Sequence, residues 1–83
     1  MHLYQEAYQA LKPRVAYIIK NHITDSYLLE ITFDSLLNIP TKECFDLFMS
    51  LHDYALDIDR ELAEDYMQIY NDTYNEKEKV HQF

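Results

Sequence analysis

Apolar and aromatic residues recur along the first quarter of the chain at alternating spacings of four and three residues. The stripe comprises Tyr4, Tyr8, Leu11, Val15 and Ile18, and His22 follows in step. This spacing places side chains on one face of a helix, so we expect a helix over about residues 3–22. Pro13 lies inside the segment and removes one backbone hydrogen bond, yet the stripe continues in register across it. The pattern therefore predicts one kinked helix rather than two helices.

The next apolar segment, residues 26–37, fits two different patterns. A helical face would hold its large apolar residues Leu29, Phe33, Leu36 and Leu37. Residues 29–33 instead alternate and include β-branched side chains, which is typical of a strand. A single strand would have no evident partner to pair with in this chain, so we favour a short helix.

The segment from Thr41 to Lys79 contains no proline or glycine and predicts a third, long helix. Asn38 can take the left-handed conformation of a helix end, Pro40 ends the preceding helix, and Thr41 is a suitable N-cap. At 1.5 Å per residue the third helix would be about 58 Å long, against about 30 Å and about 18 Å for the other two. The fold predicted is an all-α three-helix bundle with a long acidic C-terminal helix.

The apolar stripe of this long helix extends further than two shorter helices can cover. Its members are Phe48, Leu51, Ala55, Ile58, Leu62 and Ile69. Either the chain breaks near Asp59, which would cap a fourth helix, or the C-terminal half projects and packs against a second copy. The unbroken register favours the second alternative, a homodimer through the C-terminal helix. Residues 1–83 are expected to form a single helical domain, with a frayed, charged tail over residues 75–83.

Charge is distributed unevenly along the 83 residues. Residues 1–22 carry three Lys or Arg against one acid, a net charge of +2, whereas residues 23–83 carry four against fourteen, a net charge of −10; together these give −8. Direct binding to nucleic acid needs clustered Lys and Arg, and an anionic membrane would repel this chain. A basic protein surface, including one that normally binds nucleic acid, would attract it.

Cysteine content and hydropathy indicate the compartment. The single cysteine, Cys44, can form no disulfide within the chain, and its acidic neighbours Glu43 and Asp46 argue against a reactive thiol. No apolar run approaches the length of a membrane span, and the first residues lack the basic opening of a signal peptide. We expect a cytoplasmic, soluble protein.

The acids and histidines do not form a pattern that supports metal binding or catalysis. The only Glu-x-x-His pair is Glu78 with His81, in the tail, and the segment from Asp57 to Glu61 opens like a calcium loop without its turn glycine. The chain has no glycine at all, so it has no glycine-rich loop for a phosphate and no nucleophile elbow. We expect no metal, no cofactor and no enzymatic activity.

A row of acids along the predicted long helix is the first candidate binding feature. Asp53, Asp57, Glu61 and Asp65 follow one another at four-residue spacing, with Glu64 beside them. Like charges at this spacing destabilise a helix by about 0.2–0.5 kcal/mol per pair, and only Arg60 is close enough to offset them. The basic residues of the first helix are too few to neutralise the whole row. We therefore expect an exposed negative ridge that attracts a basic partner.

Tyrosine is the second candidate feature, since eight of the 83 residues are tyrosines. Tyr66, Tyr70 and Tyr74 stand one turn apart in the acidic half of the long helix, beyond the expected reach of the other helices. Tyrosine is enriched at interface hot spots, so an intermolecular contact is at least as well supported there as an internal one. Three further tyrosines, at positions 4, 8 and 17, are expected to pack on the protein's own core.

No family motif is recognisable, but in size and charge the chain is generally similar to antitoxins, immunity proteins and phage-encoded inhibitors. That resemblance implies a non-enzymatic protein that occludes a basic surface of a partner protein. The acids would set the association rate and orientation, and the tyrosines would supply the buried contact. Two alternatives remain: a nucleic-acid mimic that blocks a DNA- or RNA-processing enzyme, and a purely structural homo-oligomeric adaptor.

Overall fold

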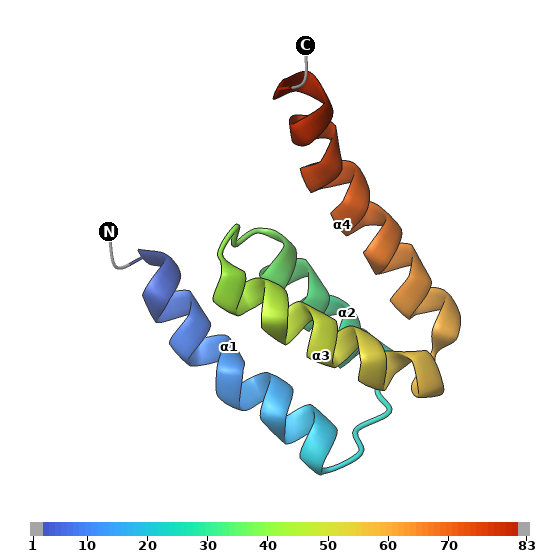
Figure 1. The fold of residues 1–83 in the computed structure, drawn as a ribbon. Coiled ribbons are helices and arrows are strands. Elements are labelled where there is room, and N and C mark those ends of the chain that lie inside the picture. Colours follow the sequence, from blue (N-terminus) through green and yellow to red (C-terminus); the bar gives the residue numbers. More distant parts are fainter. Residues whose placement is uncertain (1–2, 82–83) are drawn as a thin grey trace.

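The computed structural model describes the backbone of residues 3–81 and the side chains of residues 4–74. Four helices follow one another along the chain: α1 (Leu3–Lys20), α2 (Ser26–Leu37), α3 (Lys42–Ile58) and α4 (Arg60–His81) (Figure 1). Residues 3–81 contain no strand, so the all-α prediction is confirmed and residues 26–37 are helical. The prediction of three helices is wrong, and the alternative with a break near Asp59 is correct. The predicted fraying of residues 75–83 lies outside the described side chains.

Pro13 does not interrupt α1, and Figure 1 shows this helix without the sharp bend that we predicted. The side chains of Pro13 and Gln9 are both exposed. The carbonyl group of Gln9, which has no amide partner at position 13, therefore belongs to the solvent side of the helix, where water can hydrogen-bond to it. The opposite face of α1 buries Leu11, Val15 and Ile18, so packing is uninterrupted across the proline.

His22 supplies the left-handed helix end that a chain without glycine lacks. Its φ angle is 53°, and the backbone amide of Ile23 donates to the carbonyl of Ile18 at 3.0 Å. The amide of His22 donates to the carbonyl of Ile19 at 3.3 Å, which completes a Schellman-type end to α1. Asn38, the residue predicted to take this conformation, instead has a right-handed φ of −84°.

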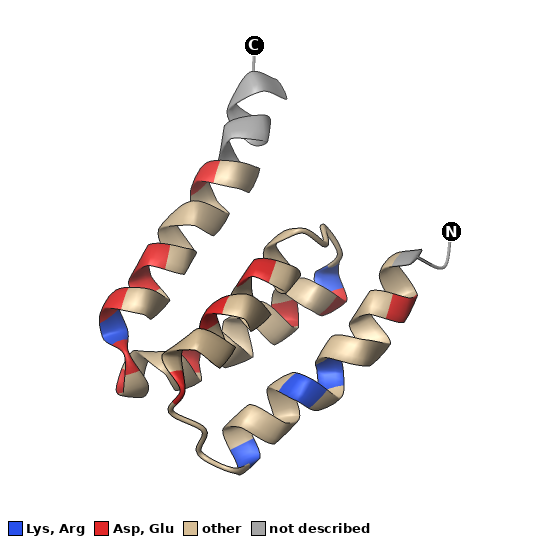
Figure 2. Ribbon diagram, turned by 180° about the vertical axis from the view of Figure 1, so that it is seen from behind, with Lys and Arg blue, Asp and Glu red and all other residues tan. Residues whose placement is uncertain are grey.

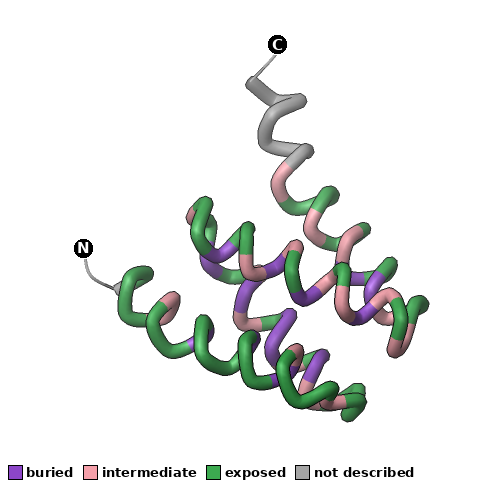
Figure 3. Tube along the Cα trace, turned by 60° about the horizontal axis from the view of Figure 1, so that its bottom comes forward, coloured by how far each residue is buried: buried purple, intermediate pink, exposed green. Residues whose placement is uncertain are grey.

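The core lies around α3, which packs against each of the other three helices. Figure 3 shows the buried positions on the sides of the helices that face one another. The largest fully buried side chains on α2 and α3 are Leu29, Phe33, Leu36, Phe48 and Leu51. Phe33 and Phe48 meet edge to face, with ring centroids 5.2 Å apart. Cys44 is also fully buried within this core.

Asp59 divides the predicted long helix into α3 and α4. Its amide donates to the carbonyl of Ala55 at 2.8 Å and closes α3, while its Oδ1 accepts from the amide of Leu62 at 3.2 Å and caps α4. Its Oδ2 accepts a hydrogen bond from Ser26 Oγ at 3.0 Å, which fixes the junction to the start of α2. One non-helical residue (φ −151°, ψ 85°) is thus enough to turn the chain without proline or glycine.

The break lets α4 fold back against α2 and α3 instead of projecting along the axis of α3 (Figure 1). Ala63 and Tyr66 of α4 are buried in the same core as the residues of α1, α2 and α3. The predicted homodimer requires an apolar stripe that nothing within the chain covers. The part of that stripe that the structure describes is covered largely within the chain, although Ile69 stays exposed.

Candidate binding site

The predicted acidic ridge is divided between two helices. Asp53 and Asp57 lie on α3, whereas Glu61, Glu64 and Asp65 lie on α4, and all five side chains are exposed. The prediction of one continuous row on one helix is therefore wrong, because the turn at Asp59 changes the direction of the chain in the middle of the row. Figure 2 shows the acids distributed over α3 and α4 and the basic residues of α1 along a separate helix.

The junction between α3 and α4 brings together a different set of acids. We call this set the acidic elbow and define it as Asp25, Asp57, Asp59 and Glu61. Asp25 belongs to it because its neighbour Ser26 is hydrogen-bonded to Asp59. Asp25 caps α2 by accepting from the amide of Tyr27 at 3.0 Å, so two of the four carboxylates also hold helix ends. The sequence predicted Asp57 and Glu61 as binding residues. Nothing in it indicated Asp25, which is more than thirty positions away in the chain and lies at this junction because α2 begins there.

Few of the exposed acids have cationic partners. Arg60 Nη1 lies 3.5 Å from Glu64 Oε2, and both side chains are more than half exposed, so this pair adds little stability. His52 Nδ1 lies 3.5 Å from Asp53 Oδ1 but has no hydrogen-bond partner among the described residues. Asp57, Glu61 and Asp65 form no ion pair within 4.0 Å in the described part of the chain. These three charges remain available to an external partner.

Asp57 carries its negative charge at the end of α3 where the helix dipole is also negative. It lies in the last turn of α3, which contains no basic residue, and a negative charge at a helix C-terminus is unfavourable by about 0.3–1 kcal/mol. Glu61, in the first turn of α4, lies where the helix dipole favours a carboxylate. Of the four acids of the elbow, Asp25, Asp59 and Glu61 thus lie at helix N-termini, where they stabilise the fold, and Asp57 alone lies at a helix C-terminus, where it destabilises it.

The structure places Tyr66 in the protein's own core. The side chain is 7% exposed, and its ring stacks on that of Phe33 with centroids 4.9 Å apart. Its hydroxyl donates to Asp34 Oδ1 at 2.6 Å. Burial raises the pKa of Tyr66 above its usual value, and the hydrogen bond to Asp34 and the charge of that carboxylate raise it further. Tyr66 is thus a protonated donor at neutral pH.

Tyr70 and Tyr74 continue this internal contact along α4. The ring of Tyr70 lies 5.3 Å from that of Phe45 and 4.7 Å from that of Phe48, between ring centroids. The hydroxyl of Tyr74 donates to the carbonyl of Leu37 at 2.7 Å, at the end of α2. Burial is the main cause of a raised pKa for both residues. The premise that the tyrosine row lies beyond the other helices is wrong, because α4 folds back onto them.

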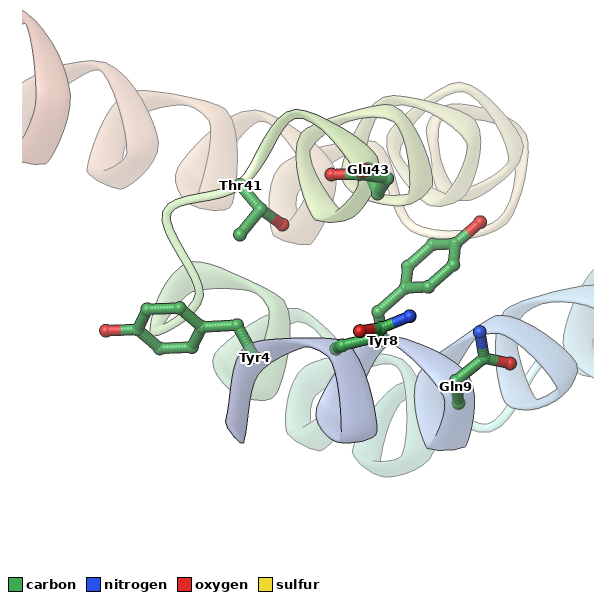
Figure 4. Close-up of a pocket in the computed structure, with 6 residues that line it drawn as sticks. Tyr4, Tyr8, Gln9, Thr41 and Glu43 are labelled. Atoms are coloured by element: carbon green, nitrogen blue, oxygen red, sulfur yellow. The ribbon is translucent and has the colours of Figure 1, made fainter. Parts of the chain in front are cut away.

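A cleft that the sequence did not indicate opens between α1 and the first turn of α3. It has a volume of about 430 Å³ and is lined by Tyr4, Gln5, Tyr8, Gln9, Thr41 and Glu43 (Figure 4). Of the tyrosines expected in the core, Tyr4 and Tyr17 are exposed and Tyr8 is half-buried. The spacing of the two tyrosines at positions 4 and 8 places them on one face of α1, but only the packing of α1 beside α3 brings Glu43 opposite them.

Metal binding and membrane insertion find no structural support in the described part of the chain. Within it, no three His, Cys, Asp or Glu side chains are grouped so that they could hold a metal ion. None of the described helices combines the length and the apolar character needed to cross a membrane. Glu78 and His81 lie outside the described side chains. The chain matches no protein-family model, and neither the curated proteins nor the solved structures include a match to it.

Proposed function

We propose that this protein is a non-enzymatic binding module that occludes a basic surface of a partner protein through Asp57 and Glu61 of its acidic elbow and the acids on either side of these two. The residues proposed to contact the partner are Asp53, Asp57, Glu61, Glu64 and Asp65. The observation that carries this proposal is Asp57, an exposed carboxylate without an ion-pair partner among the described residues, at a helix end where it destabilises the fold. Binding sites commonly retain such residues at a cost to stability.

The electrostatics of the molecule suit recognition of a positively charged surface. A net charge of −8 on 83 residues produces a negative field that accelerates encounter with a basic protein and orients it. The tyrosine row no longer supplies the apolar contact, because its rings pack on α2 and α3. Ile69, 45% exposed on α4 and one turn after Asp65, is the apolar side chain best placed to join the acids in an interface.

The test is affinity capture from a lysate of the source organism with two variants of equal net charge. One carries Asp57→Lys and Glu61→Lys in the elbow; the matched control carries Glu6→Lys and Glu30→Lys, exposed positions on α1 and α2. We expect the wild-type protein and the control to retain a common basic partner that the elbow variant loses. Loss from both variants would show that net charge alone drives capture, and retention by both would remove the elbow from the proposed interface.

Salt dependence of the captured complex separates occlusion of a protein surface from mimicry of nucleic acid. A packed protein interface should lose only modest affinity as salt rises, because its apolar contact is not screened. An acid array that replaces phosphates should lose affinity by orders of magnitude between about 50 and 200 mM salt, as nucleic-acid complexes do. We expect the shallow dependence, because the acids follow two helix directions rather than one regular row.

A further inference from the structure

The cleft between α1 and α3 has the composition of a site for an organic cation. Tyr4 and Tyr8 contribute aromatic rings, Gln5 and Gln9 contribute amide oxygens, and Glu43 is the one charged side chain among the described residues of the lining. In Figure 4 the rings of Tyr4 and Tyr8 diverge on α1 and Glu43 lies above them on α3. Aromatic faces together with a carboxylate attract cations and exclude anions.

We propose that this cleft binds a guanidinium group, the side chain of an arginine on the partner's basic surface. A guanidinium is planar, stacks on aromatic rings and offers five donors, which matches a lining of two tyrosines, two amides and one carboxylate. A lysine ammonium is a compact, strongly hydrated charge that uses fewer of these acceptors. The identification of the arginine as a partner residue rests on the proposed function; binding of the guanidinium group itself does not.

A second contact supports a cation at these tyrosines. Lys12 Nζ lies 5.9 Å from the centroid of the Tyr8 ring, so the structure already places a positive charge against this aromatic group. Lys12 does not line the cleft itself, and the lining residues that the structure describes include no Lys or Arg. An arginine that enters the cleft would therefore compete with Lys12 for the Tyr8 ring, while Glu43 stays without a cationic partner among the described lining residues.

The N-terminus of α3, which borders the cleft, is the main feature that disfavours a cation there. A helix N-terminus favours anions by about 0.3–1 kcal/mol in exposed positions. Here Thr41 Oγ1 already accepts from the amide of Cys44 at 3.2 Å, which satisfies one of the free amides that an anion would use. The full negative charge of Glu43, in the first turn, outweighs the partial positive charge of the helix end. The balance favours a cation.

The test is a titration of the ¹⁵N-labelled full-length protein, followed by NMR, with N-acetyl-arginine methylamide as the probe. The citrulline analogue, which has the same shape without the charge, is the matched control ligand. We expect saturable shifts at residues 4–9 and 41–44 with the arginine probe and none with citrulline. Equal shifts with citrulline, a preference for the lysine analogue, or shifts in the cleft with inorganic phosphate would each overturn the assignment.

Variants locate the site and separate this inference from the proposed function. Glu43→Gln and Tyr8→Leu should each weaken the arginine probe by about three- to tenfold, whereas Glu61→Gln, in the elbow, should leave it unchanged. Unchanged affinity for the arginine probe in Glu43→Gln would refute the cleft as the site. The amide spectrum of this variant shows directly whether its fold is retained. Because the probe is a small molecule, its failure to bind leaves the capture experiment at the elbow unaffected.

Discussion

Tyr66→Phe tests whether α4 is held onto the core by the hydroxyl of that tyrosine. The substitution keeps the ring that stacks on Phe33 at 4.9 Å and removes only the donor to Asp34 Oδ1, 2.6 Å away. A hydrogen bond to a charged acceptor contributes about 1.5–3 kcal/mol in favourable cases. Asp34 is exposed and regains water in the variant, so we expect a value at or just below the lower end of that range. We expect the free energy of unfolding to fall by about 1–1.5 kcal/mol.

Urea unfolding followed by circular dichroism measures this change directly. For a domain of this size the loss corresponds to a melting temperature lower by roughly 5–10 °C. Tyr27→Phe is the matched control, since Tyr27 is 69% exposed on α2 and its hydroxyl makes no hydrogen bond to the described residues. A double-mutant cycle with Asp34→Ala isolates the pair. An unchanged stability in Tyr66→Phe, or a coupling energy near zero, would refute the reasoning that this contact fixes α4.

Four further predictions follow from the structure. The raised pKa values of Tyr66, Tyr70 and Tyr74 mean that the folded state holds these protons more tightly than the unfolded state. Their contribution to stability is complete below about pH 10 and is lost as the pH rises above it. Urea titrations from pH 7 to 11 should therefore show the free energy of unfolding falling at the high end. Asp57→Asn should raise the free energy of unfolding by about 0.3–1 kcal/mol and weaken partner binding; a lower stability would contradict the dipole argument. His22→Gly should stabilise the protein by about 0.5–1 kcal/mol in the same assay, because glycine takes the left-handed conformation without strain. Light scattering should give the 10.0 kDa mass of a monomer, because most of the described stripe is covered within the chain; twice that mass would restore the homodimer prediction.

Local patterns predicted the helices well where capping residues marked their ends. Thr41 caps α3 as its position after Pro40 suggests, and the stripe through Leu11, Val15 and Ile18 is the buried face of α1. The break at Asp59 was harder to place, because a single capping residue leaves the apolar stripe in register on both sides. Its non-helical backbone and its side-chain hydrogen bonds to Leu62 and Ser26 distinguish it from an interior helical aspartate, and both depend on the folded structure.

The arrangement of the candidate site depends on whether Asp59 ends the helix. With a continuous helix, the acids form a single row and the tyrosines extend beyond the bundle. With the break, the acids are divided between α3 and α4, and the tyrosines contact Phe33, Phe48 and Leu37. Individual exposure of the acids was predictable from charge. Contacts between residues more than thirty positions apart, such as Tyr66 with Asp34, depend on the path of the chain and carry no local signal.

The central claim is that the acids of the elbow, and not the tyrosine row, contact the partner. The measurement that tests it most directly is calorimetry of the captured partner with two variants of this protein, Asp57→Lys with Glu61→Lys and, separately, Tyr74→Phe. The first variant should lose at least about 100-fold in affinity, as close charge pairs at protein interfaces do, and the second should bind like the wild type. Retained affinity in the first variant together with a large loss in the second would contradict the account and return the tyrosines to the interface.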